Sequence, residues 1–381
     1  MVVSYNIMTD KRKLCFIIPE YNLSTPTHFN YLYEFIEKIS NDFDIFLIAE
    51  KGLGDPPKGV TRFYIQKFNR PILRIIENEL AIERARVLGY KTFYIHYSFL
   101  SAYNASIITR FFGGQVFYWN CGEPWKYKRS FARDFFEHTV YKLIHFLVTG
   151  TEGLKKKYAE HYKLPLEKIK VMPNYIDVSS IKYQVLSIKN DLKKNLNISS
   201  DTKVVLFVHR LSKRKGAYYL PEILKELKDE NMVLLVVGDG PERKMIEVEA
   251  SRQGLEAKIR FLGWLPQKDL AGYYAMADVF IMPSDEEGFP HVILESMVYG
   301  VPFVAFDVGG VKEIVPADAL QYVVPSGDVK LFAEKTKELL LTSDESLNEM
   351  GAVLFKHVAS LYDINSVSRD FTVLIKDIII K

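Results

Sequence analysis

The sequence predicts an α/β protein made of two Rossmann-like, doubly wound domains in tandem. Short apolar runs alternate with amphipathic stretches, a pattern typical of parallel sheets with crossover helices. The alternation stops over the polar residues 182–200 and then begins again. The 381 residues also exceed the ~250–300 at which single hydrophobic cores stop growing. Together these observations favour two domains facing a cleft.

In the first half, apolar runs predict six buried strands and the stretches between them predict helices. The expected strands are Leu14–Ile18, Ile45–Ala49, Phe63–Ile65, Phe93–Ile95, Val116–Tyr118 and Phe146–Thr149. The expected helices include His28–Ile39, Ile72–Leu88 and Thr151–Tyr162. We therefore assign residues 1–180 to an N-terminal Rossmann-like domain and 181–201 to a linker.

The second half repeats the alternation. The expected strands are Val204–Val208, Val233–Val237, Ile259–Phe261, Val279–Met282 and Pro302–Ala305. The expected helices are Gly216–Lys228, Glu242–Gln253, His291–Tyr299 and Leu331–Leu341. We assign residues 202–365 to a C-terminal Rossmann-like domain, and we expect a helix over 366–381 to pack back towards the N-terminal domain. Ligands of such sheets bind beyond the carboxyl ends of the strands.

Composition excludes several classes of protein. With 48% hydrophobic and 25% charged residues, the chain is neither disordered, collagen-like nor a disulfide scaffold. Only Cys15 and Cys121 are present, which favours a reducing compartment. No apolar run reaches the ~18–20 residues of a membrane span, and the N-terminus lacks a secretory core. We therefore expect a cytoplasmic protein.

Charge is distributed unevenly between the halves. Residues 1–180 carry 25 basic and 18 acidic side chains, a net +7, whereas the remainder carries 25 and 29, a net −4. The overall net charge of +3 is too small to indicate a nucleic-acid binder, and we expect no nucleic-acid partner. The asymmetry indicates an anionic partner for the first half, with chance surface composition as the alternative.

The strongest motif is E-G-F-P-H-V-I-L-E, which runs from Glu287 to Glu295 after a predicted strand and is followed by S-M-V-Y-G-V-P. A loop carboxylate, a glycine and a helix start suit a ligand that has both hydroxyls and phosphates. Glu295 can accept paired hydrogen bonds from a vicinal diol such as ribose. Taken singly, Glu287 could be a loop charge and Glu295 a partner of the helix dipole.

A second motif, H-R-L-S-K-R-K-G, runs from His209 to Gly216 after another predicted strand. Arg210 and Lys215 place two cations at a strand-to-helix turn. An arginine fork and a lysine point charge together suit a diphosphate. Basic loops are usually only solvated, so this motif alone would be weak.

The two motifs together resemble the retaining nucleotide-sugar glycosyltransferases of family four, which have the GT-B fold. The resemblance implies that Glu287, with Gly288 beside it, approaches the transferred sugar and that Glu295 binds the donor ribose. It also implies that Arg210 and Lys215 neutralise the donor phosphates, so that 202–365 is the nucleotide-sugar donor domain and 1–180 lies on the acceptor side. Within the two motifs, Pro290 and His209 stand where glycine is usual. Elsewhere, Tyr175 replaces a usual glycine, the loop 19–26 lacks the usual Gly-Gly, and the segment 119–125 lacks a usual histidine.

Backbone groups complete the predicted donor site. Because Pro290 has no N–H, the remaining backbone donors to the diphosphate are Phe289, His291 and Val292. Gly238, in V-G-D-G-P, is expected at a tight turn beside the cleft. The segment F-L-G-W-L-P resembles the family's nucleobase-lining segment, and it contributes Gly263, Trp264 and Leu265. Structural turns are the alternative for both segments.

In the first half, His96 ends a predicted strand where family members often carry a histidine close to the transferred sugar. We therefore predict a catalytic role for His96, with a buried strand-end histidine as the alternative. The segment Trp125–Phe136 interleaves cations with aromatic residues, which suits an anionic membrane surface. Its alternative is a helix with phenylalanines inward and cations outward.

The resemblance implies a retaining glycosyltransferase that moves a hexose from a UDP- or GDP-sugar to a hydroxyl of a glycan or lipid-linked acceptor. We expect no cofactor and no metal, since no metal-ligand spacing occurs among the eight histidines and two cysteines. We expect at most peripheral contact with the cytoplasmic membrane face. The alternatives are a non-catalytic nucleotide-sugar-binding subunit and a sugar-nucleotide epimerase of the same fold.

Overall fold

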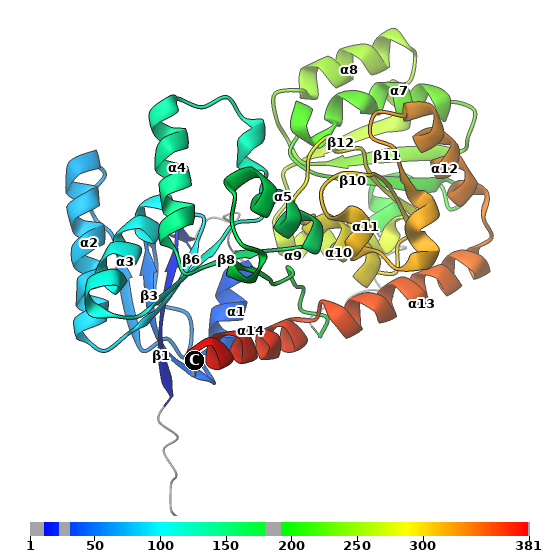
Figure 1. Ribbon diagram of the computed structural model, residues 1–381. Helices are drawn as coiled ribbons and strands as arrows, with labels where there is room; N and C mark the ends of the chain where they lie inside the picture. The colour runs from blue at the N-terminus through cyan, green and yellow to red at the C-terminus, as the bar shows by residue number, and fades with distance from the viewer. Residues whose placement is uncertain (1–10, 23–30, 180–191, 380–381) are drawn as a thin grey trace, which may run out of the picture. The chain divides into compact units, whose positions relative to one another are not determined.

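Two parallel β-sheets organise the protein, of which this computed structural model describes residues 11–22, 31–179 and 192–379 (Figure 1). Each sheet belongs to its own unit. Unit 1 comprises the chain up to Thr149, Lys155–Met172 and the chain from Ser368 onwards, whereas unit 2 comprises Gly150–Leu154 and Pro173–Val367. The predicted class, α/β with parallel sheets in two domains, is confirmed.

Unit 1 contains a seven-stranded sheet in the order β5-β3-β1-β6-β7-β8-β9. Its strands are β1 (Arg12–Ile18), β3 (Phe43–Ala49), β5 (Arg62–Ile65), β6 (Thr92–His96), β7 (Gln115–Trp119), β8 (Phe146–Thr149) and β9 (Ile169–Val171). A separate pair joins β2 (Tyr21–Asn22) to β4 (Gly52–Leu53). All these pairings are parallel, and the strand order reverses between β1 and β6.

Helices cover both faces of the unit 1 sheet. They are α1 (Tyr31–Ile39), α2 (Pro71–Val87), α3 (Phe99–Phe112), α4 (Phe131–Leu143) and most of α5 (Glu152–Tyr162), together with the last part of α14 (Ile364–Ile379). On one face, the buried ring of Phe371 in α14 lies 5.2 Å from Phe35 of α1 and 4.8 Å from Tyr94 of β6. The C-terminal helix is thus part of the unit 1 core.

Unit 2 contains a six-stranded parallel sheet in the order β12-β11-β10-β13-β14-β15. Its strands are β10 (Lys203–Val208), β11 (Met232–Val237), β12 (Ile259–Gly263), β13 (Val279–Met282), β14 (Phe303–Phe306) and β15 (Val323–Val324). β10 and β11 read K-V-V-L-F-V and M-V-L-L-V-V, because strands covered by helices on both faces are apolar almost throughout. The order reverses between β10 and β13, which is the topological switch point of the sheet.

Helices also cover both faces of the unit 2 sheet (Figure 1). They are α7 (Leu220–Glu226), α8 (Arg243–Arg252), α9 (Gln267–Met276), α10 (His291–Val298), α11 (Val311–Ile314), α12 (Val329–Leu341) and α13 (Asp344–Leu361). The helix predicted over 216–228 is shorter than expected. It begins only at Leu220, because Gly216 has a left-handed φ of 64° that separates two short 3-10 turns.

The boundary between the units falls at Met172/Pro173, earlier than the predicted 180/181. Residues just after Pro173 bond to the end of α13: the N–H of Ile176 donates to the carbonyl of Tyr362 (2.9 Å), and the N–H of Ile364 donates to the carbonyl of Ile176 (3.0 Å). These bonds tie the segment to unit 2. Most of the predicted linker, 181–191, lies outside the described residues, and 192–195 form a helical turn.

Helix α4 corrects in part the interpretation in which its phenylalanines point inward. Phe136 is half-buried, with its ring 5.4 Å from that of Tyr103 on α3, but Phe131 and Phe135 point outward. Its buried face consists of Glu137, Val140 and Tyr141, at helical spacing. Phe131 and Phe135 are 86% and 65% exposed, and their rings lie 6.4 Å apart. Among the described residues, no helix is long and apolar enough to cross a membrane. Cys15 and Cys121 are buried and are not joined in a disulfide.

Candidate functional site

The predicted donor residues of unit 2 gather at the switch point of its sheet. β10 and β13 are neighbours, with Val205 opposite Val279. The loop after β10 carries His209, Arg210 and Lys215, and the loop after β13 carries Glu287. Parallel strands end on the same edge of a sheet, so these two loops meet beyond that edge. This is where open α/β sheets bind their ligands.

Two glycines with left-handed backbones bring the loops together. Gly216 has φ 64°, and a Cβ there would lie 1.5 Å from the carbonyl oxygen of Pro283. Gly309 has φ 57°, and a Cβ there would lie 1.9 Å from the carbonyl oxygen of Glu287. Only glycine permits both the conformation and the close approach. The backbone of the Glu287 loop is therefore held from two sides.

The carboxylate of Glu287 is held by two side chains from the loop after β10. Lys215 Nζ lies 2.7 Å from both Oε1 and Oε2 of Glu287. His209 Nε2 lies 3.1 Å from Oε1. The Lys215 and Glu287 side chains are only 9% and 6% exposed. The pair lies 72 residues apart in sequence, so no local pattern could have predicted it.

The charges of this cluster follow from burial and pairing. Burial alone would raise the pKa of the Glu287 carboxyl, but the Lys215 ammonium and the His209 hydrogen bond hold that pKa well below its usual range. Burial and the charge of Lys215 lower the pKa of His209. Near neutral pH, the site therefore contains an ionised glutamate beside a neutral histidine.

The two predicted phosphate-binding cations occupy different environments. Lys215 is buried against Glu287, whereas Arg210 is exposed. Within residues 11–22, 31–179 and 192–379, no acidic side chain pairs with the Arg210 guanidinium. Of the two cationic groups, only the guanidinium of Arg210 is fully available to an anion. Lys215 uses two of its three N–H donors on Glu287.

The predicted backbone donors lie at the start of α10. Pro290 is the N-cap residue, and the helix begins at His291, followed by Val292. N–H groups in the first turn of a helix lack acceptors within the helix and favour anions. The carbonyl of Phe289 accepts a hydrogen bond from Asn174 Nδ2 (3.2 Å), and the carbonyl of Gly288 accepts one from the N–H of Gly310 (3.1 Å). The loop before α10 is thus held through its backbone carbonyls, which bond to Asn174 and Gly310 of two other segments.

Glu295, on the same helix, is buried with both carboxylate oxygens in hydrogen bonds. Gln267 Nε2 donates to Oε1 and the Tyr274 hydroxyl donates to Oε2, each at 2.7 Å. Burial raises the pKa of Glu295 against these two bonds. The Tyr274 ring stacks on Tyr299, with the centroids 5.3 Å apart. Sequence reasoning missed Gln267 and Tyr274, because only the fold brings α9 against α10.

The two predicted turn glycines lie together. The N–H of Gly238 donates to the carbonyl of Gly263 at 2.7 Å, so the ends of β11 and β12 are joined. Trp264 follows with its side chain 58% exposed, and Leu265 is half-buried. The indole of Trp264 therefore presents an accessible aromatic face, of the kind on which a planar base can stack.

His96 lies in unit 1, at the end of β6 beside that sheet's switch point. Its ring is buried and stacks on Trp119 (4.7 Å) and Phe16 (5.4 Å). Burial lowers the pKa of His96 to about 3. These surroundings match the alternative of a buried strand-end histidine, although Nδ1 has no hydrogen-bond partner in the described chain.

In sequence, part of the chain is similar to known glycosyltransferases. Residues 188–352 match the family model "Glycosyl transferases group 1". An uncharacterised glycosyltransferase from Methanocaldococcus jannaschii is 32% identical over 171 residues, 44% of each chain. The N-acetyl-α-D-glucosaminyl L-malate synthase of Bacillus anthracis is 30% identical over 208 residues, 54% of this chain and 50% of that one. The chain thus matches about half the length of these relatives.

Solved structures match almost the whole chain. Sucrose-phosphate synthase from Thermosynechococcus elongatus has a TM-score of 0.79 at 20% identity, covering 97% of this chain and 99% of that one. HepE from Anabaena, solved in complex with UDP-glucose, has a TM-score of 0.77 at 17% identity, covering 96% and 99%. At these identities the likeness concerns the fold alone, and it confirms the predicted GT-B fold.

We predict that Lys215 stabilises unit 2 by neutralising Glu287. Lys215→Met should lower the free energy of unfolding by about 3–5 kcal/mol, because it leaves a buried carboxylate without its cation. Lys215→Met/Glu287→Leu should recover most of that loss, since both charges are then removed. Chemical denaturation followed by circular dichroism measures both effects.

Lys203→Met is the matched control. Lys203 Nζ pairs with Asp344 at the same 2.7 Å, but the two side chains are 27% and 83% exposed. Its loss should cost no more than about 1 kcal/mol, as for most surface pairs. Equal losses for Lys215→Met and Lys203→Met would contradict the role given to burial.

Proposed function

We propose that this chain is a group 1 glycosyltransferase that moves a hexose from a UDP- or GDP-sugar to a hydroxyl of a glycan or lipid-linked acceptor, with retention of anomeric configuration. One observation carries the proposal. A buried, ionised Glu287 is held by Lys215 at the switch point of the unit 2 sheet, and the exposed Arg210 follows the same strand as Lys215. Such a site suits a ligand that combines a diphosphate with a sugar.

The donor groups divide the work by chemistry. Arg210 receives the diphosphate as a fork, and the N–H groups of Phe289, His291 and Val292 add neutral donors around the start of α10. The remaining N–H of Lys215 reaches towards the same charge. Glu295 accepts from the ribose hydroxyls, and Trp264 stacks on the base.

Bond breaking between the sugar and the diphosphate leaves positive character on the sugar ring and negative charge on the leaving phosphate. Arg210 and Lys215 stabilise the phosphate charge, and the buried Glu287 carboxylate stabilises the sugar. The acceptor oxygen forms the new bond on the face that the phosphate leaves, and its proton passes to that phosphate. No protein nucleophile is required.

A catalytic role for His96 remains a prediction. A ring that is neutral near pH 7 can hold a substrate hydroxyl by a hydrogen bond, but the unpartnered Nδ1 of His96 is buried, so this role requires the ring to become accessible. It does not supply a proton at that pH. The prediction that no metal or cofactor takes part is likewise carried into the proposal, in which Arg210 and Lys215 provide the positive charge.

The comparisons support glycosyl transfer and leave the substrates to experiment. The match over residues 188–352 is to a family defined by this activity. The relatives named above carry out or are assigned glycosyl transfer, and HepE has been solved with UDP-glucose. A D-inositol 3-phosphate glycosyltransferase from Corynebacterium jeikeium is also similar, at 28% identity. We therefore choose UDP-glucose as the first donor to test.

Glu287→Gln should lower kcat/KM for transfer by about 10²–10³-fold, because the neutral amide no longer stabilises positive charge on the sugar. The assay measures release of UDP or GDP from UDP-glucose, UDP-N-acetylglucosamine and GDP-mannose. Free hexoses, inositol phosphate and detergent-solubilised polyprenyl phosphates serve as acceptors. Proton NMR of the product's anomeric centre tests retention.

Glu338→Gln is the control for this experiment. Glu338 lies on α12, outside the loops that carry the site, and it pairs with Lys335 at 2.7 Å with the two side chains 43% and 23% exposed. The turnover of Glu338→Gln should stay within about threefold of the wild type, since exposed ion pairs contribute little. Unchanged transfer by Glu287→Gln would refute this assignment. Binding of a sugar nucleotide without turnover would favour a non-catalytic subunit.

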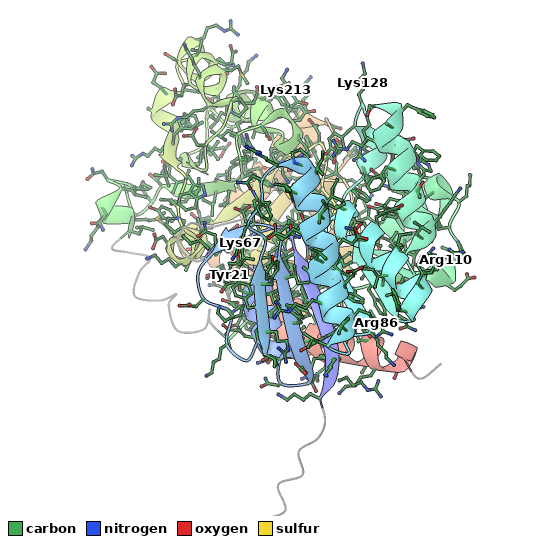
Figure 2. All side chains as sticks on the ribbon, turned by 90° about the vertical axis from the view of Figure 1, so that its left-hand side faces the viewer. Tyr21, Lys67, Arg86, Arg110, Lys128 and Lys213 are labelled. Carbon is green, nitrogen blue, oxygen red and sulfur yellow. The ribbon has the colours of Figure 1, made fainter. Side chains whose placement is uncertain are left out.

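We further propose that α4 seats unit 1 on an anionic membrane that carries the acceptor. The exposed pair Phe131 and Phe135 lies close to Lys128 and Arg133 in sequence, and these two exposed cations have no acidic partner within the described residues. Figure 2 shows Lys128 projecting at the top of unit 1, away from Arg86 and Arg110. Buried phenylalanines contribute ~1.5–3 kcal/mol each and surface cations ~1 kcal/mol each. The sum suits reversible binding.

Phe131→Ser/Phe135→Ser should abolish flotation with vesicles containing phosphatidylglycerol. The two substitutions remove the apolar rings that would enter the membrane but leave Lys128 and Arg133 in place. Phe111→Ser/Phe112→Ser is the control. These two rings are 76% and 64% exposed, but they lie on α3 and not on the proposed membrane-binding helix α4. The wild type should bind less at high salt, because salt screens the cations. Binding that ignores lipid charge, or that survives Phe131→Ser/Phe135→Ser, would reject this surface.

A further inference from the structure

His209 places a side chain in the site where the family pattern has none. It follows β10 directly, in the position where glycine is usual, and its side chain is only 19% exposed. Its backbone N–H continues the sheet by donating to the carbonyl of Val237 at 3.0 Å. The imidazole is therefore fixed at its base and directed at Glu287.

The hydrogen bonds of the ring define its tautomer. The backbone N–H of Arg210 donates to Nδ1 at 3.2 Å, so Nδ1 is the unprotonated nitrogen. A neutral imidazole then carries its single proton on Nε2, which lies 3.1 Å from Glu287 Oε1. His209 thus donates a hydrogen bond to the carboxylate of Glu287. Because the Arg210 N–H occupies Nδ1, the donating nitrogen is Nε2.

The hydrogen bonds to Glu287 leave little of its carboxylate available to a ligand. A carboxylate offers about four acceptor positions, two on each oxygen. Oε1 accepts from both His209 and Lys215, and Oε2 accepts from Lys215. One acceptor position therefore remains, on Oε2. Rotation of the carboxylate would break these bonds, so the direction of that position is fixed as well.

We infer that His209 is a positioning residue for glycosyl transfer, which orients Glu287 through its Nε2–H and leaves Oε2 to accept one hydroxyl of the transferred sugar. This inference rests on the proposed function. It concerns the sugar end of the donor and not the nucleotide end, because His209 contacts Glu287 and has no hydrogen bond to Glu295. His209 should therefore affect the rate of transfer more than the affinity for UDP.

The test compares two replacements of His209, with UDP-glucose and UDP as probes. His209→Phe keeps a ring but removes the donor, and it should lower kcat about tenfold, the value of one hydrogen bond to a charged group. The Kd for UDP should stay within about twofold, which a general loss of structure would not allow. His209→Gln carries an N–H at similar reach and should restore most of the lost kcat.

Two further variants separate positioning from structural damage. In a Glu287→Gln background, His209→Phe should cause little additional loss, because a residue that acts through Glu287 has nothing left to orient. His357→Phe removes a comparable histidine bond, 2.9 Å from Nε2 to the carbonyl of Ile314, and should leave kcat near the wild-type value. Equal kcat for His209→Phe and the wild type, or additive losses with Glu287→Gln, would overturn the inference.

A measurement without substrate distinguishes failure of the inference from failure of the proposed function. Nitrogen NMR of the ¹⁵N-labelled histidine rings should show His209 protonated on Nε2 at pH 7, with that proton signal shifted in Glu287→Gln. Protonation on Nδ1, or no response to Glu287→Gln, would overturn the inference whatever the activity. If the NMR result holds but UDP-glucose and the other donors neither bind nor turn over, the proposed function fails instead.

Discussion

The buried ion pair between Glu287 and Lys215 determines the geometry of the whole unit 2 site. Each charge would be costly to bury alone, so the two loops that carry them must meet. Gly216 and Gly309 allow that meeting, because any Cβ there would overlap the carbonyl of Pro283 or of Glu287. The pair leaves Glu287 ionised although its side chain is buried, and a buried fixed charge acts more strongly on a developing charge than an exposed one does.

The fold explains why this pair lies at the edge of the sheet where ligands of such folds bind. The strand order reverses between β10 and β13, and open α/β sheets bind their ligands at the carboxyl edge where the order reverses. The exposed Arg210 and the start of α10 lie at that edge, on the two loops. Glu295 lies further along α10, held by Tyr274 and Gln267 of α9. An exposed cation, a helix terminus and two buried carboxylates thus lie along one edge of one sheet.

Local sequence patterns predicted the parallel sheets, because apolar runs such as Val204–Val208 and Val233–Val237 indicate buried strands. The spacing of Glu287 and Glu295 could also be recognised from the sequence, because both residues lie in one short segment. Contacts between distant segments were not predictable: Lys215 and His209 reach Glu287 across more than seventy residues. Helix α3 lacks an apolar stripe because it buries Ser101, Ala102 and other small residues, so its pattern gave no signal.

A crystal structure of the chain with UDP-glucose tests the central claim most directly. The account predicts the diphosphate against Arg210 and the start of α10, the ribose hydroxyls within hydrogen-bond distance of Glu295, and the hexose in contact with Oε2 of Glu287. It also predicts that Lys215 still binds Glu287 in the complex. Binding of the nucleotide away from the edge between β10 and β13, or a Glu287 carboxylate released from Lys215 and turned away from the sugar, would contradict it.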